Sequence, residues 1–211
     1  MGLFYYVEIL FEYLEHKVIT KNQILGKVVN NTPIVEQKTD SEGNIKKEKV
    51  SLYKLSEKTI KLLTDRIQDE YKAHYLYRAA ANWCHDANYM KAAKFFDDDA
   101  NTELEHAQVL EKYMTDFNII PKIPTAKTDF TFKGLPDIIF QAYEVELNLM
   151  KAYNSISHEL FQEDLTTFDF LKYFRDIQKE SVVEFNDLIN GLQLVDMNDK
   201  FQVLYFEQTY F

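Results

Sequence analysis

The chain has 211 residues, 46% of them hydrophobic, which is enough for one folded domain with an additional segment. Its formal net charge of −10 argues against nonspecific binding to nucleic acid or to anionic membranes and suits a protein that attracts cations. The single cysteine, Cys84, excludes an internal disulfide and favours a reducing, cytoplasmic compartment. We expect no membrane span, because no stretch reaches the roughly 20 apolar residues that one needs, and no secretory signal.

Residues 1–54 differ from the rest and are predicted to form an N-terminal extension. Residues 3–16 predict an amphipathic helix with three glutamates on one face. Residues 34–37 and 45–52 flank a turn-rich segment, which predicts a β-hairpin. Because so apolar a helix must bury one face, the extension either decorates the following domain or docks an unknown partner.

Residues 55–211 predict an all-α domain. The whole chain contains only five glycines and four prolines, and no proline interrupts the periodic apolar stretches. Ser56 is a suitable N-cap for the first helix, and Gly191 a suitable C-cap for the fourth. The expected helices span residues 56–86, 89–118, 136–161 and 167–191, followed by a short fifth helix at 198–208.

The connection between the second and third long helices contains Pro121, Pro124 and Gly134 and has no helical period. A connection of this length joins parallel neighbours in a helical bundle, whereas a tight hairpin would join antiparallel ones. The sequence therefore predicts a four-helix bundle with one long crossover.

Each of the four long helices has an apolar stripe, at spacings of three and four residues, that metal-binding or hydrogen-bonding side chains interrupt. An ionised carboxylate inside a bundle costs several kcal/mol unless something pairs with it. A single Glu-x-x-His on one helix is common by chance, but interruptions on four helices are not. Three glutamates and a histidine that converge on one core therefore predict a bound cation. The interrupting residues are Glu70 and Tyr77, Glu103 and His106, Glu146, and Gln178.

Several motifs resemble the signatures of true ferritins. Residues 69–77 read DEYKAHYLY, residues 93–96 read AKFF, and residues 102–107 read TELEHA. They are similar to the family patterns E-L-Y-A-x-Y-L-Y, A-x-F-F and E-E-x-E-H-A, in the same order and with the same gaps. The likeness covers about residues 55–192, with a weaker match at the fifth helix, and implies a ferritin-like four-helix bundle. Residues 1–54 have no counterpart in the family.

The resemblance also implies a di-iron ferroxidase centre that oxidises Fe(II) to Fe(III). Glu103 would bridge the two irons, and His106 would complete the first site. A second site built on Glu146 would bind more weakly and release oxidised iron for storage. The implied residues are Glu70 and Tyr77 on the first helix, Glu103 and His106 on the second, Glu146 on the third and Gln178 on the fourth.

The chain departs from the family pattern at some positions. A third iron site would need acids where Thr102 and Ile177 stand, which leaves only Glu180, so we expect no third site. Thr102 and Gln108 also replace acids that line the mineral cavity of some ferritins. Oxidation is therefore a firmer expectation than efficient mineral nucleation.

The leading hypothesis is an iron-storage ferritin that uses O₂ or peroxide and assembles into a homo-oligomeric shell of about 24 subunits. A first alternative is a di-iron carboxylate oxidase with an organic substrate, which the absence of a second Glu-x-x-His beside Gln178 disfavours. A second is a DNA-protecting mini-ferritin, which the negative charge disfavours. A third is a structural ferritin-fold subunit that binds a partner through residues 1–54.

Overall fold

The computed structural model describes residues 35–39, 45–49, 53–125 and 129–211, and the chain separates into two units, Met1–Leu52 and Tyr53–Phe211. In the first unit, β1 (Val35–Thr39) and β2 (Ile45–Lys49) pair antiparallel, with Val35 opposite Lys49. A hairpin was predicted here, and the residues after Lys49 in its second predicted strand lie outside the described residues. The helix predicted at residues 3–16 lies outside the described residues.

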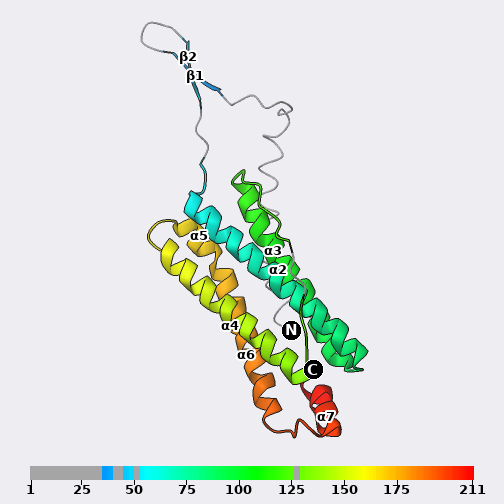
Figure 1. Ribbon diagram of the computed structural model, residues 1–211. Coiled ribbons are helices and arrows are strands. Elements are labelled where there is room, and N and C mark those ends of the chain that lie inside the picture. The colour runs from blue at the N-terminus through cyan, green and yellow to red at the C-terminus, as the bar shows by residue number, and fades with distance from the viewer. Residues whose placement is uncertain (1–34, 40–44, 50–52, 126–128) are drawn as a thin grey trace. The chain divides into compact units, whose positions relative to one another are not determined.

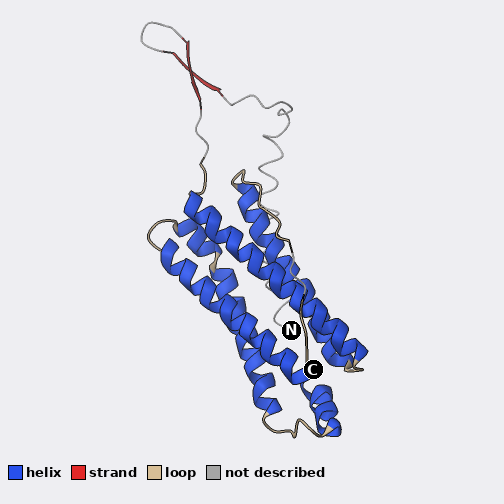
Figure 2. Ribbon diagram, in the orientation of Figure 1, coloured by secondary structure: helices blue, strands red, loops and turns tan. Residues whose placement is uncertain are grey.

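The second unit is a bundle of four long helices, as the sequence predicted, with two shorter helices (Figures 1 and 2). None of the helices in the described residues has the length and apolar composition that crossing a membrane requires. The helices are α2 (Glu57–Asp86), α3 (Met90–Asp116), α4 (Leu135–Leu160), α5 (Leu165–Phe170), α6 (Lys172–Leu192) and α7 (Lys200–Tyr210).

Two helix pairs make up the bundle: α2 packs along α3, and α4 packs along α6, while α2 also contacts α4. In Figure 1, α3 ends and α4 begins at opposite ends of the bundle, so the connection between them crosses its whole length. Consequently α3 and α4 run parallel and α2 and α4 run antiparallel. This is the predicted crossover topology, and it brings four stripes to one core.

The helix ends follow from local sequence. The Ser56 side chain accepts a hydrogen bond from the Thr59 amide at 3.0 Å and caps α2, as predicted. Pro136 lies in the first turn of α4, where its missing N–H has no intrahelical partner to lose. Asn88 and Asn118 follow α2 and α3 with φ of 64° and 60°, a left-handed conformation that asparagine tolerates better than most residues.

The fourth helix was predicted at about residues 167–191, and the structure has helix there, with a break at one residue. The structure begins it at Leu165, interrupts it at Leu171 and extends it to Leu192. It starts early because the Asp164 side chain accepts a hydrogen bond from the Thr167 amide at 3.0 Å and so caps α5.

Gly191 was predicted to cap the end of this helix, but it lies inside α6, whose C-cap is Gln193. Its role is steric. A Cβ at position 191 would lie 2.6 Å from the Tyr210 ring and 2.9 Å from the Phe206 ring. Glycine therefore lets α7 pack closely against the end of α6.

A buried carboxylate also fixes α7 to the bundle. The fully buried Glu207 accepts hydrogen bonds through Oε1 from the Lys91 amide at 2.7 Å and the Ala92 amide at 3.1 Å. Tyr89, the N-cap residue of α3, makes no side-chain capping bond. A residue on α7 thus satisfies the first amides of α3, where the helix dipole also favours a negative group.

Candidate metal centre

Three side chains from two helices form a compact cluster in the core. Glu70 comes from α2, and Glu103 and His106 come from one face of α3, three residues apart. One ligand atom from each lies within 4.8 Å of the others. His106 Nδ1 is 3.3 Å from Glu103 Oε2 and 3.7 Å from Glu70 Oε2. All three are buried, with exposed fractions of 0% to 4%.

Glu146 on α4 and Gln178 on α6 are buried in the same core. The Tyr77 hydroxyl, from α2, donates a hydrogen bond to Glu146 Oε1. Burial, and after it the negative charge of Glu70, raises the pKa of Glu146, which places the two carboxylates in one electrostatic environment. All six residues predicted for the site are therefore buried inside the bundle.

Several polar atoms of this core have no hydrogen-bond partner. They are Glu70 Oε2, Glu146 Oε2, and both Oε1 and Nε2 of Gln178. Buried polar groups are almost always paired, and an unpaired one costs about 1–3 kcal/mol, more when it is charged. Oxygen atoms from three different helices thus lack a partner that a cation with oxygen and nitrogen ligands would supply. The residues present fit such a cation.

The electrostatics of the cluster are those of crowded buried acids. Burial raises the pKa of Glu103 well above its usual range, against the opposing effect of His106. Burial alone would lower the pKa of His106, but Glu103 and Glu70 outweigh it and raise that pKa well above its usual value. Burial raises the pKa of Glu146 to about 7, although the Tyr77 hydroxyl opposes the shift. A divalent cation would relieve this repulsion by replacing protons.

Tyr153 on α4 is a residue of this centre that the sequence reasoning did not assign. It is fully buried and donates its hydroxyl to Glu70 Oε1. Burial, followed by the charge of Glu70, raises its pKa well above the usual value, so the hydroxyl keeps its proton. The signal was in the sequence, because Tyr153 follows Glu146 by seven residues, just as Tyr77 follows Glu70.

Asp99 on α3 is a second residue near this centre that the sequence reasoning did not assign to the site. It stands one helical turn before Glu103 on α3. Burial raises its pKa to about 8, with further contributions from Glu184 on α6 and Glu146 on α4. The negative potential of the centre therefore extends along α3 toward α6.

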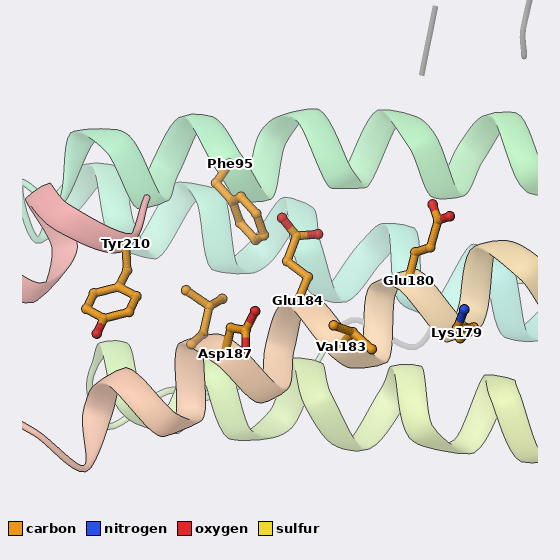
Figure 3. Close-up of a pocket in the computed structure, with 8 residues that line it drawn as sticks. Phe95, Lys179, Glu180, Val183, Glu184, Asp187 and Tyr210 are labelled. Carbon is orange, nitrogen blue, oxygen red and sulfur yellow. The ribbon is translucent and has the colours of Figure 1, made fainter. Parts of the chain in front are cut away.

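A surface hollow of about 500 Å³ lies where α6 approaches α3 and α7 (Figure 3). Phe95 and Tyr210 line it, and Glu180 and Glu184 extend from α6 on the side that faces α3. None of the residues predicted to bind iron lines it. The sequence predicted no third iron site, because Glu180 is the only acid at the three positions that such a site would need. That expectation stays a prediction.

The helical bundle matches a known protein family. The model of the ferritin-like domain family matches residues 60–195. The bacterial non-heme ferritin of Campylobacter jejuni is 29% identical over 143 residues, which cover 67% of this chain and 86% of that protein. The bacterial non-heme ferritin of Staphylococcus aureus is 30% identical over 159 residues, which cover 72% and 92%.

Solved structures share the fold. An open pore ferritin from the archaeon Archaeoglobus fulgidus has a TM-score of 0.66 at 21% identity, over 74% of this chain and 97% of that one. A humanized archaeal ferritin has a TM-score of 0.69 at 22% identity, over 74% and 95%.

Proposed function

Since the chain belongs to the ferritin family of ferritin-like domains, we propose that it oxidises Fe(II) inside its helical bundle and stores the ferric product. The observation that carries the proposal is the buried Glu70, Glu103 and His106 cluster with its unpaired carboxylate oxygen. Such a group is costly in an apolar core unless a cation completes it. The names of the curated relatives support iron as that cation.

Two adjacent sites account for the donor atoms. Glu70, Glu103 and His106 would hold the first Fe(II), because carboxylate and imidazole are ligands that this ion accepts. Glu146 and Gln178, with Glu103 shared between the irons, would hold the second more weakly. Each Fe(II) gives one electron to O₂, which takes up two protons and leaves as hydrogen peroxide. The weaker second site would let Fe(III) move on to storage.

The test is an anaerobic Fe(II) titration followed by exposure to O₂, with ferric absorbance recorded during the reaction. We expect two Fe(II) bound per subunit and fast oxidation of both. Binding of Fe(II) without oxidation would support a metal site but contradict the proposed ferroxidase activity. Absence of Fe(II) binding would contradict the proposed function altogether.

The Gln178→Glu variant should bind iron more tightly at the second site and turn over more slowly. A carboxylate there would attract Fe(III) more strongly than a neutral amide does. Single-turnover oxidation should persist, while multi-turnover oxidation should lag because the product leaves slowly. Stopped-flow absorbance over repeated Fe(II) additions measures both. Gln193→Glu, an exposed change at the end of α6, is the control, and equal multi-turnover rates in both variants would make Gln178 a packing residue.

Assembly into a closed shell, of about 24 subunits, is part of the proposal, since soluble homo-oligomers close by point-group symmetry. The exposed apolar side chains on α7 support it, because Phe201 and Tyr205 are 74% and 64% exposed and available for contacts between subunits. Light scattering should report one large particle whose mass rises with stored iron. A monomer or dimer at micromolar concentration would contradict the shell. Deleting residues 1–54 in the same assay tests whether the extension contributes to assembly.

A further inference from the structure

Two hydrogen bonds between tyrosines and glutamates connect α2 and α4 in a reciprocal pattern. Tyr77 on α2 donates to Glu146 on α4, and Tyr153 on α4 donates to Glu70 on α2. On each helix the tyrosine follows the glutamate by seven residues, which is close to two turns and places both on one face. Because the helices run antiparallel, the two pairs are related by an approximate two-fold axis.

Each hydrogen bond uses one oxygen of its carboxylate and leaves the other unpaired. Tyr153 occupies Glu70 Oε1, and Glu70 Oε2 remains buried without a hydrogen bond, 3.7 Å from His106 Nδ1. Tyr77 occupies Glu146 Oε1, and Glu146 Oε2 is likewise unpaired. In both pairs the hydroxyl thus fixes which oxygen is free for a metal ion.

The tyrosine rings are themselves held by α6. Tyr153 stacks on Phe174 with ring centroids 5.0 Å apart and an interplanar angle of 11°. Tyr77 stacks on Phe185 at 6.2 Å and 11°. Phe174 also meets the His106 ring edge-on at 6.0 Å, so one phenylalanine orients two members of the first site. Both hydroxyls therefore have little freedom to turn away.

We propose that Tyr153 is a positioning residue of the first metal site, which holds Glu70 with its Oε2 turned toward the ion beside His106. Tyr77, which the resemblance to ferritins already implied, makes the matching contact with Glu146 and serves as the comparison. The inference rests on the proposed function, since it assumes a metal ion at this centre. It assigns each tyrosine to a different site, which sequence similarity to ferritins did not suggest for Tyr153.

Anaerobic titration with Co(II), followed by its visible absorption, tests the assignment without any oxidation step. Wild-type protein should bind two Co(II) per subunit in two steps. Tyr153→Phe should weaken the first step by at least roughly tenfold, the usual effect of losing a partner that orients a ligand, and leave the second nearly unchanged. Tyr77→Phe should show the converse. The unaffected step reports in each sample that the bundle is intact.

The control is Tyr113→Phe. This change removes a hydroxyl that shares a hydrogen bond with Thr167 Oγ1 at 2.9 Å, and Tyr113 lies on α3 seven residues beyond His106, outside the centre. Under O₂, Tyr153→Phe should raise the Fe(II) concentration for half-maximal rate more than it lowers the maximal rate. An unchanged first Co(II) step in Tyr153→Phe would overturn the inference while leaving the proposed function standing. Absence of Co(II) and Fe(II) binding to wild-type protein would instead remove the proposed function.

Discussion

Glu103→Ala and His106→Ala should each abolish fast Fe(II) oxidation while the bundle remains folded. Glu103 is the proposed shared ligand of both irons, and its loss should slow oxidation by more than the roughly 10–100-fold typical of losing a residue that only orients a ligand. The fold should survive because each change removes one buried ionisable side chain, while the apolar stripes of the four long helices remain intact. The melting temperature of metal-free Glu103→Ala should stay the same or rise, since the change removes an acid whose charged form is disfavoured by burial and by the charges of Glu146 and Glu70.

Stopped-flow absorbance and thermal unfolding of the same preparations measure these two effects. Glu105→Ala is the matched control, because Glu105 lies between the two ligands on α3 but is exposed to solvent. It should retain the wild-type oxidation rate. Wild-type rates in both Glu103→Ala and His106→Ala would rule out the proposed centre.

Glu207→Ala should lower the stability of the bundle well beyond the effect of an ordinary surface change. It leaves the Lys91 and Ala92 amides at the start of α3 without their acceptor and detaches the end of α7. We expect about 2 kcal/mol, the upper range for the loss of a helix cap. For a domain of this size that is a fall in melting temperature of roughly 4–8 °C.

Calorimetry at one fixed protein concentration measures this fall, because assembly contributes to the apparent stability. Glu207→Gln keeps an acceptor oxygen and should recover part of the loss. Thr209→Ala, an exposed change on the same helix, should have little effect. Equal melting temperatures for Glu207→Ala and Thr209→Ala would show that α7 is held by its apolar contacts alone.

The crossover topology and the site residues could both be predicted from local pattern. The stripes of three and four residues place Glu70, Glu103 and Glu146 on inward faces of their helices, whatever their neighbours are. One long connection with proline and glycine separates α3 from α4, and its length predicts that these two helices run parallel. The spacing of apolar residues within each helix was therefore enough to predict the bundle and the proposed ligands.

Contacts between helices were decided only by the tertiary structure. Gly191 reads as a cap in the sequence, yet it is required because the rings of α7 pack against it. Glu207 reads as a surface acid on a short helix, yet it caps α3 from a distance of more than a hundred residues along the chain.

Tyr153 shows the same division between sequence and structure. Its place in the apolar stripe of α4 determines that it is buried, because residues at helical spacing share one face. Whether its hydroxyl meets Glu70 or another group depends on the register between α2 and α4, and side-chain packing across the bundle sets that register. The sequence by itself determined the fold family, the helices and the residues that face the core, while the tertiary structure decided which of those residues hold one another in place.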